Sequence, residues 1–517
     1  MNTAAKPGSG SSVRIWTLAA AGYLALAVAI TWPLALRLDR VVANDPGDPL
    51  LNTWILWWNS RALPFTRAWW DAPVFWPVGG AMAFSETLVG LAALTTPLQW
   101  IGLRPLAVYN LTLLLSWPLS ALAAHALGYA LTRRHAPSAV AGLVFGFNPY
   151  RIDQVPHLQM LACWWMPLAL LGLHRALERG LAGGPRAAAP WLVLFSAAWL
   201  LQSLSNTYLL VYFSLAVALW LAWFVPWRAR PALACAFAAA AAAAVLPLVP
   251  VLLKYRVVHA LWGFQSVAGE IAHYSGDLRA FASASGYMLL WPFREPPGPE
   301  QALYPGAVAL ALAAAGVCSG YRRSRGSPEG SRRTRLSILL LAAGALFVGA
   351  AIVTAAVGSW SIELGDLTIR SRRARKPLSI GLGLLVAATV LHPRFRGAAA
   401  RRSAFAFYGL LAALSWAAAL GPVAHISEEI VFEWLPYRLL LFLPGVDALR
   451  VPSRFAIVAA LGLAVAAALA LVRLTTTRTR AAALALSALA VAGVVADSLS
   501  RPFPLPPEPP HYRLPPD

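Results

Sequence analysis

Long apolar stretches follow one another from residue 16 almost to the last residues of the chain. A helix needs roughly 20 apolar residues to cross a hydrocarbon core about 30 Å thick. Counted in this way, the sequence predicts about thirteen membrane spans. They fall near residues 16–37, 105–131, 137–147, 158–177, 188–204, 207–226, 231–253, 304–320, 336–357, 377–392, 404–420, 454–472 and 481–499. The predicted fold class is all-α, a polytopic transmembrane helical bundle with outward-facing loops and juxtamembrane helices.

Composition points to the same class. Apolar residues make up 59% of the chain and charged residues 12%, with a mean hydropathy of +0.62, whereas a soluble domain carries about 25% charged residues. The net charge of +21 would suggest nucleic-acid binding in a soluble protein. Here topology and anionic lipid explain it better, because no basic stripe interleaved with aromatic residues is present to bind nucleic acid.

The sequence predicts one integral membrane domain. The apolar run behind "MNTAAKPGSGSSVR" is too long for a cleaved signal peptide and is interpreted as the first span. We expect a transmembrane domain over residues 1–475, a last transmembrane helix over 476–501 and a proline-rich outer tail over 502–517. Three cysteines lie in apolar stretches without paired spacing, which is typical of small core residues; they are Cys163, Cys235 and Cys318.

Arginine-rich connections set the predicted orientation. By the positive-inside rule, the connections "HRALERGLAGGPR", "PWRAR", "YRRSRGSPEGSRRTR", "PRFRGAAARR" and "RLTTTRTR" are cytoplasmic. The long segments 38–104, 254–303 and 421–453 then share the outer face, provided that the borderline apolar segment 86–103 does not span. One basic cluster disagrees, because "IRSRRARKP" (369–377) falls outside. Either a span between 340 and 392 is misread, or these side chains serve a lipid phosphate.

Two acids stand together in "NDPGDPLLNTWILWW", directly ahead of a tryptophan-rich helix. One interpretation is structural, with Asp48 as the N-cap and Pro49 at the first helical position. The other is functional, since a carboxylate fixed by prolines and a glycine at the outer membrane edge could act as a base or a metal ligand. Asp45 and Asp48 are both candidates, and the two interpretations are compatible.

Glu86 begins the apolar segment "ETLVGLAALTTPLQWIGL" in the same outer loop. It could be a first-turn acid that the helix dipole favours. It could also face Asp48 across the loop, and paired acids at a membrane surface suit glycosyl transfer. The nearby aromatic residues Trp69, Trp70, Phe75 and Trp76 fit an interfacial belt better than a sugar-binding platform.

Two further segments carry candidate residues. In "FNPYRIDQVPHLQML", Arg151, Asp153 and His157 lie at a membrane edge, where ionisable residues are functional candidates; the alternative is an Arg151–Asp153 pair that reaches the headgroups. In "RLLLFLPGVDALRVPSRF", three arginines surround a Pro-Gly break and could form an anion site or simply snorkel. They are Arg438, Arg450 and Arg454.

The loop 254–303 holds ionisable residues that the sequence does not rank: Lys254, Arg256, Glu270, His273, Asp277 and Glu300. The chain contains no HExxH, no phosphate-cradling glycine loop that ends in Lys-Ser or Lys-Thr, no nucleophile elbow and no Cys-x-x-Cys. Soluble nucleotide chemistry is therefore disfavoured, and a lipid-borne substrate on the outer face is favoured.

Taken in order, several segments resemble the GT-C superfamily of integral-membrane glycosyltransferases, especially its bacterial members. They are "GDPLLNTW", "FSETLVG", "NPYRIDQVPHLQML", "ALYPG" and "PGVDALRVPSRF", and the resemblance spans most of residues 14–475. It implies an enzyme of the bacterial inner membrane. Such an enzyme takes a hexosyl or pentosyl group from a polyprenyl-phosphate-linked donor and transfers it to a glycan, lipid or protein acceptor on the periplasmic face.

The resemblance also implies roles for the candidate residues. Asp48 would be the catalytic base, Glu86 a second acid that orients the acceptor or a metal, and Asp45 a further acid of the same site. The donor phosphate would be bound by Arg151, His157, Arg450 and Arg454. A divalent metal is a possible cofactor, with Asp45 and Asp48 as its candidate ligands.

Two other classes of protein remain open at this stage. A transporter or flippase for lipid-linked glycans would need internal repeats or helices broken at mid-membrane around a polar path, and most charges here lie instead at the membrane edges. The third interpretation is a non-catalytic membrane scaffold whose acids are helix caps.

Overall fold

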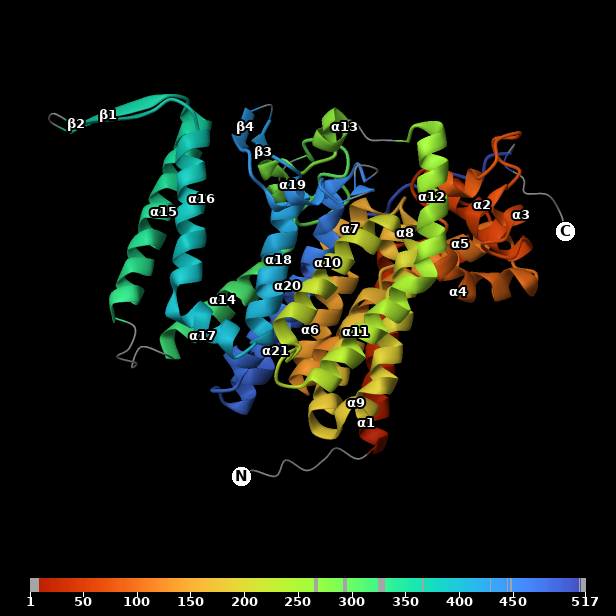
Figure 1. Cartoon of the computed structure of the whole chain (residues 1–517), viewed down its shortest axis with the longest axis horizontal. Helices are drawn as coiled ribbons and strands as arrows, with labels where there is room; N and C mark the ends of the chain where they lie inside the picture. Colours follow the sequence, from red (N-terminus) through yellow and green to blue (C-terminus); the bar gives the residue numbers. More distant parts are fainter. Residues whose placement is uncertain are drawn as a thin grey trace.

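The computed structural model describes residues 9–264, 268–291, 295–323, 331–364, 367–427, 429–443, 445–446, 449–510 and 512. They form a helical bundle (Figure 1). The longer helices are α1 (Ser9–Ile30), α2 (Asp48–Arg61), α4 (Val89–Trp100), α5 (Pro105–Thr132), α6 (His135–Gly146), α9 (Trp165–Ser205), α10 (Thr207–Phe224), α11 (Pro231–Val245), α12 (Val249–Trp262), α14 (Ala307–Arg323), α15 (Ser331–Val357), α16 (Arg375–Leu391), α17 (Pro393–Ala400), α18 (Ala404–Ala419), α20 (Ala456–Thr475) and α21 (Arg480–Asp497).

Short elements sit between these helices. They are α3 (Arg67–Trp70), α7 (Pro149–Asp153), α8 (Leu158–Leu161), α13 (Ala268–His273), α19 (Pro436–Leu440), the 3-10 turns η1 (Leu34–Leu36), η2 (Ala81–Phe84), η3 (Leu246–Leu248), η4 (Leu278–Ala282) and η7 (Pro452–Phe455), and the strands β1 (Trp360–Leu364), β2 (Leu367–Ser371), β3 (Ala424–Ile426) and β4 (Glu429–Phe432). The strands form two antiparallel hairpins, β1–β2 and β3–β4.

The protein is a multi-pass helical membrane protein, as the sequence predicts. Eight helical runs among the described residues are long and apolar enough to cross a membrane. One of them, Leu158–Ser205, holds two of the expected spans on either side of a break at Gly184. Four other expected spans correspond to α6, α14, α16 and α18, which have 12, 17, 17 and 16 residues. These helices are shorter than the roughly 20 residues that a membrane span needs.

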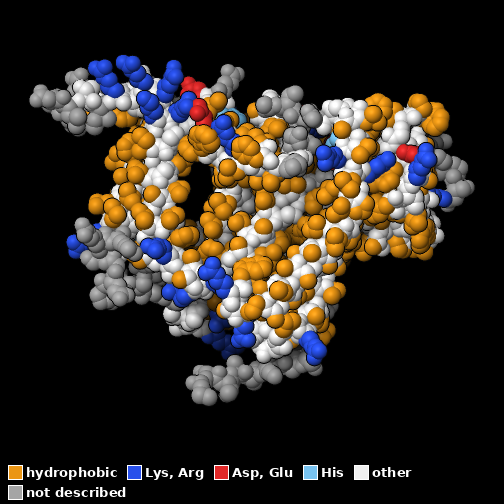
Figure 2. Space-filling view, in the orientation of Figure 1, with side chains coloured by type: hydrophobic (Ala, Val, Ile, Leu, Met, Phe, Trp, Pro, Cys, Tyr) orange, Lys and Arg blue, Asp and Glu red, His pale blue; other side chains and the backbone are white. Residues whose placement is uncertain are grey.

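The centre of the bundle is formed by α20 and α5. Their most apolar windows are 89% and 72% buried, against 39% or less for the other six runs. The buried face of α20 consists mainly of small and aliphatic residues, so its neighbours approach closely. At Gly462 an added Cβ would lie 2.8 Å from the backbone nitrogen of Ala412 in α18. The outer helices expose aliphatic side chains along their length, and charged side chains gather toward the two ends (Figure 2).

The predicted outer segments share one end of the molecule. In Figure 1 the helices α2, α3, α13 and α19 and both β-hairpins lie at the upper end, whereas α17 and the break of α9 lie at the lower end. The segment 86–103 contains only the 12-residue helix α4, which is too short to span. The cluster 369–377 lies in β2 and at the start of α16 at the upper end, between two well-formed helices.

The C-terminal tail lies on the first loop. The backbone nitrogens of Val42 and Asn44 donate to the carbonyl oxygens of Pro506 and Pro504, both at 2.8 Å. The hydroxyl of Tyr512 donates to the carbonyl oxygen of Leu50 at 2.6 Å. The described part of the expected tail thus forms part of the wall around the segment that contains Asp45 and Asp48; residues 511 and 513–517 lie outside the described part.

The expectation for the cysteines is correct for one of the three. All three are free, but only Cys163 is buried; Cys235 and Cys318 are exposed on the surface of the bundle. In a membrane bundle an apolar stretch turns part of its surface toward lipid, so an apolar sequence context alone does not predict burial in the protein core.

The close packing of α4 on α9 gives a first prediction. An added Cβ at Gly90 would overlap with the carbonyl oxygen of Leu201 and the hydroxyl of Ser205. We expect Gly90→Ala to lower stability by about 1–3 kcal/mol, because α4 must move off α9. Gly22→Ala in α1 meets nothing within 4 Å and is the control. The thermal unfolding midpoint of the purified protein, followed by tryptophan fluorescence, measures both; equal midpoints would contradict the packing.

Candidate active site

Asp48 is the first residue of α2, but it does not cap the helix. The N-cap is Gly47, and no side-chain capping bond is formed there. The carboxylate of Asp45 accepts a hydrogen bond from the Gly47 nitrogen at 2.9 Å and fixes the turn. The N-cap interpretation of Asp48 is therefore wrong. Its side chain, 45% exposed, lies instead with Oδ2 3.5 Å from Nε2 of His157.

A buried amide pair holds Asp48 and His157 together. Nδ2 of Asn52, one turn into α2, donates to Oε1 of Gln159 in α8 at 3.0 Å. His157 is the N-cap residue of α8. Because Asn52 and Gln159 are both buried, breaking this bond would leave polar groups without a partner away from water, which costs about 1–3 kcal/mol. The amide pair thus fixes the distance between the two candidate residues.

The strongest interaction of the site is the ion pair between Arg454 in η7 and Glu300. Nε of Arg454 donates to Oε2 of Glu300 at 2.8 Å and Nη2 donates to Oε1 at 2.6 Å, a bidentate arrangement. The side chains are 8% and 11% exposed. The guanidinium also lies over the ring of Tyr208, 4.5 Å from its centroid. Burial alone would raise the pKa of the Glu300 carboxyl, but Arg454 outweighs it and holds that pKa below its ordinary value.

His157 lies between the two carboxylates. Its Nε2 is 3.5 Å from Asp48 and 3.9 Å from Oε1 of Glu300. Burial lowers the pKa of His157, although both carboxylates favour its charged form. Its Nδ1 is buried and has no hydrogen-bond partner in the described protein. His157 is therefore positioned to exchange a proton or a hydrogen bond with a group bound beside Asp48.

Glu86 belongs to the same site but not to the first turn of α4, as one interpretation held, because α4 begins at Val89. It lies at the N-terminus of α10, where the hydroxyl of Thr207 donates to its Oε1 at 3.4 Å. The pKa of Glu86 is raised to about 7: burial raises it most, Arg454 lowers it, and the negative charge of Asp48 raises it. Glu86 is thus a carboxyl group poised between its neutral and charged forms.

Arg151 is not brought to this cluster. It is fully buried, and it donates to the carbonyl oxygens of Leu161 (2.9 Å) and Ser116 (3.3 Å) and to Sγ of Cys163 (2.8 Å). Its guanidinium also packs on the ring of Trp117 at 5.0 Å. These contacts join α7, α8 and α5, so in this structure the side chain of Arg151 is engaged in the bundle interior.

Three other candidates, Asp153, Arg450 and Arg438, differ in their surroundings. Burial, together with the negative charge of the nearby Glu300, raises the pKa of Asp153 to about 6. It makes no ion pair with Arg151, so the proposed Arg151–Asp153 pair is absent from the described contacts. Arg450 is more exposed and donates from Nη1 to Oε1 of Glu270 at 2.9 Å, while Arg438 stacks on Trp434 at 4.3 Å.

The described residues do not fit a metal centre. No group of three or more His, Cys, Asp or Glu side chains among them is arranged to hold a metal ion. One of the two expected ligands, Asp45, already accepts a hydrogen bond within its own turn.

Sequence reasoning placed Asp48, Glu86, His157 and Arg454 among the candidates but did not single out Glu300. Its loop, residues 254–303, contains ten Lys, Arg, His, Asp and Glu residues, and only the packing shows which of them is buried against an arginine. One backbone feature marks the position: Glu300 has a φ of 58°, a conformation uncommon for residues other than glycine and often found at functional sites.

Comparisons with known proteins are sparse. A scan of protein-family models finds no match, and neither does a sequence search of curated proteins. Among solved structures, the chain is similar to the archaeal oligosaccharyltransferase AglB from Archaeoglobus fulgidus, in complex with an inhibitory peptide and a dolichol-phosphate, with a TM-score of 0.44 and 15% identity. The match covers 95% of this chain and 56% of that one, so the chain spans little more than half of that protein.

The Arg454–Glu300 pair yields a second prediction. Glu300→Gln leaves a buried guanidinium without its counter-charge and should cost about 3–5 kcal/mol. The double variant Glu300→Gln/Arg454→Met should recover much of that loss, because it removes both charges. The matched control is Glu178→Gln: its pair with Arg133 has the same N–O distance, 2.6 Å, but the side chains are 48% and 55% exposed. We expect that change to cost about 0–1 kcal/mol.

Thermal unfolding of the purified variants, compared as a double-mutant cycle, measures these differences. Losses at Glu300 and Arg454 that simply add would show that the two side chains do not interact in the folded protein.

The raised pKa of Glu86 predicts that the stability of the protein depends on pH. Between its ordinary pKa of 4.5 and its folded pKa of about 7, the folded protein binds a proton that the unfolded chain has lost. Stability contributed by this group therefore falls as the pH rises through that window, by about 3 kcal/mol in total. Glu86→Gln should abolish this component, so the variant gains on the wild type between pH 4.5 and pH 8. Parallel unfolding midpoints of the two proteins across that range would contradict the buried state of Glu86.

Proposed function

We propose that this protein is a membrane glycosyltransferase. It would move a hexosyl or pentosyl group from a polyprenyl-phosphate donor to an acceptor on the outer, periplasmic face of the bacterial inner membrane. The observation that carries the proposal is the convergence of Asp48, His157, Glu300 and Arg454, from four distant segments, at one end of the bundle. The order of sequence motifs shared with the GT-C superfamily supports it.

The position of the cluster suits a lipid-borne substrate. Exposed aromatic side chains lie next to elements at the upper end of the bundle (Figure 1): Phe75 (60% exposed) and Trp76 (86%) follow α3, and Trp434 (68%) lies between β4 and α19. Such residues are typical of a membrane–water interface. A sugar phosphate on a polyprenyl chain is held at the same level, because its tail lies in the hydrocarbon and its polar head does not. Catalytic groups at that level reach the head without moving it into the bilayer.

The proposed reaction is a direct displacement at the anomeric carbon. Asp48, the most exposed acid of the cluster, accepts the proton of the acceptor hydroxyl as that oxygen attacks. The bond from the anomeric carbon to the phosphate oxygen breaks, and the polyprenyl phosphate leaves with the electron pair. His157 orients Asp48, and Glu86 accepts a hydrogen bond from the acceptor or donates one to it according to its protonation state.

Arg454 is the residue best placed to hold the charge of the leaving phosphate. A guanidinium has five N–H donors, and Glu300 uses two of them, so the others remain for phosphate oxygens. Glu300 keeps the guanidinium in one orientation, which lowers the cost of ordering it when the phosphate arrives. Arg450, already near Tyr274 and Glu270, is a second cation for the same role.

The test is transfer from a radiolabelled polyprenyl-phosphate sugar by the purified, reconstituted protein. Asp48→Asn should reduce transfer about 10²–10⁴-fold with an unchanged unfolding midpoint. The control is Asp39→Asn, at an aspartate of the same loop whose side chain is equally exposed, 45%, and which should transfer at the wild-type rate.

An Asp48→Asn protein as active as the wild type would exclude the role of Asp48. A folded wild-type protein that never cleaves the sugar–phosphate bond but moves labelled lipid across vesicles would instead be a flippase.

A further inference from the structure

Helices α15 and α16 form a hairpin that stands beside the bundle. At the upper end, a small apolar cluster joins hairpin residues to the rest of the protein; it contains Ala351, Ala374 and Leu378 on one side and Leu420, Ala424, Val431 and Leu435 on the other. At the lower end, α17 connects the hairpin to α18. Between these two joints, Figure 2 shows an open space flanked by hydrophobic side chains. In a bilayer, hydrocarbon chains of lipids fill such a space.

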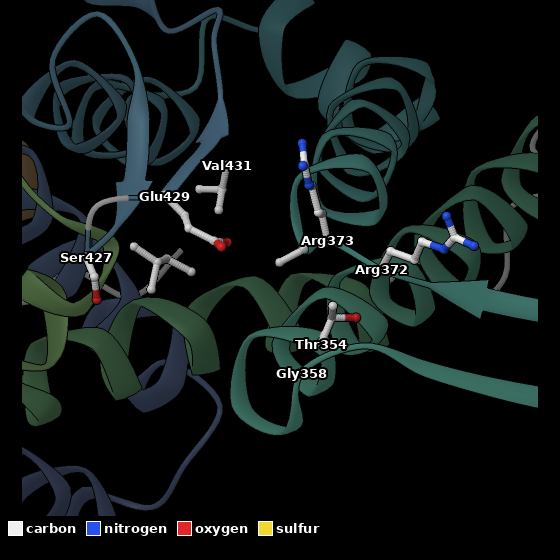
Figure 3. Close-up of a pocket in the computed structure, with 9 residues that line it drawn as sticks. Thr354, Gly358, Arg372, Arg373, Ser427, Glu429 and Val431 are labelled. Atoms are coloured by element: carbon white, nitrogen blue, oxygen red, sulfur yellow. The ribbon is translucent and has the colours of Figure 1, made fainter.

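A polar cavity of about 310 Å³ lies beside the upper joint (Figure 3). One wall belongs to the hairpin and includes Thr354, Arg372 and Arg373. The opposite wall belongs to the β3–β4 hairpin of the bundle and includes Ser427 and Glu429. The volume lies at the lower end of the range for small-molecule sites, about 300–1,000 Å³, so it suits a headgroup and not a large glycan.

The two walls carry opposite charges that are not paired with each other. Among the described residues, Arg372, Arg373 and Glu429 form no ion pair, whereas their neighbours Arg375 and Glu433 pair at 2.5 Å. All three side chains are exposed. Figure 3 shows the carboxylate of Glu429 directed into the space between the walls, with Arg373 extended along the far wall and the guanidinium of Arg372 turned away from Glu429. The cavity thus offers a cation site and an anion site separated by the space for one ligand.

Hydrogen bonds hold both walls in place. The hydroxyls of Thr354 and Ser371 lie 2.6 Å apart, and Nε1 of Trp360 donates to Thr354 at 2.9 Å, which ties α15 to the strands. On the bundle side, the Ser427 nitrogen donates to Oδ2 of Asp277 at 2.6 Å. The charges therefore stand on braced elements, which lowers the entropy lost on binding.

We propose that this cavity binds the headgroup of an aminophospholipid, a lipid that carries a phosphate and a primary ammonium group, as phosphatidylethanolamine does. The phosphate meets Arg373, with Arg372 as a second cation at the outer edge of the same wall, and the ammonium donates to Glu429. The acyl chains lie in the open space between the α15–α16 hairpin and the bundle. This assignment also gives a role to the basic cluster 369–377 at the upper end.

Charge distinguishes this ligand from the other lipids at hand. A polyprenyl phosphate or phosphatidylglycerol has no cation, so its phosphate would face the carboxylate of Glu429 without compensation. Phosphatidylcholine has a cation, but its quaternary nitrogen has no N–H to donate. Only a primary ammonium makes a charge-assisted hydrogen bond to Glu429 while the phosphate pairs with arginine. The inference does not depend on the proposed glycosyl transfer, because none of these residues belongs to the candidate active site.

The experiment is native mass spectrometry of the full-length protein in detergent, titrated with phosphatidylethanolamine, phosphatidylcholine or phosphatidylglycerol of identical acyl chains. The wild type should bind phosphatidylethanolamine about tenfold more tightly than either other lipid. Arg372→Ala/Arg373→Ala should weaken binding of phosphatidylethanolamine about tenfold. Glu429→Gln should remove its advantage over phosphatidylglycerol. Arg370→Ala, at an exposed arginine of β2 that does not line the cavity, is the control and should bind like the wild type.

Two results would overturn the proposal. Tighter binding of phosphatidylglycerol than of phosphatidylethanolamine by the wild type would identify a general anionic-lipid surface. An unchanged lipid preference in Glu429→Gln would show that Glu429 does not bind the ammonium group of the lipid. Unfolding midpoints of all variants, measured in parallel, confirm that the exposed substitutions leave the fold intact. Sugar transfer plays no part in the readout, so failure here is separate from failure of the proposed enzyme activity.

Discussion

The bidentate pair of Arg454 and Glu300 is the interaction on which the candidate site depends. It joins the residues at the start of the most deeply buried helix, α20, to the loop that contains Glu300. Two charges this well shielded persist only because each satisfies the other. Through Glu300 the pair also defines the position of His157, and through His157 that of Asp48. The Arg454–Glu300 pair is thus the central ion pair of a site whose residues come from four separate segments.

The sequence predicts the bundle well, because spanning a membrane needs long apolar runs that are visible without any tertiary information. It predicts the ends of the helices less well: α4 begins three residues after Glu86, and the two spans expected at 158–177 and 188–204 extend until only a break at Gly184 separates them. The common end of the outer segments follows from the arginine-rich connections. Which face of the membrane that end occupies remains a prediction.

The site residues divide by the kind of information they need. Asp48, Glu86 and His157 are rare ionisable residues next to apolar helices, and rarity alone marks them. Arg151 looks identical by that criterion, yet its side chain turns inward to carbonyl oxygens and Cys163. Glu300 is one of ten Lys, Arg, His, Asp and Glu residues in its loop. The direction of a side chain and the burial of a loop residue are set by tertiary packing, so no local pattern could have separated these cases.

The clasp between the C-terminal tail and the first loop has a consequence for biogenesis. The backbone nitrogens of Val42 and Asn44 donate to the carbonyl oxygens of Pro506 and Pro504, which the ribosome delivers after the described helices α1 to α21. Until then the segment before Asp48 lacks its hydrogen bonds to the tail. Glu300 likewise lacks its counter-charge until Arg454 has been inserted. The end of the molecule that carries the candidate site is therefore completed late, and a partly inserted chain would lack that site in its finished form.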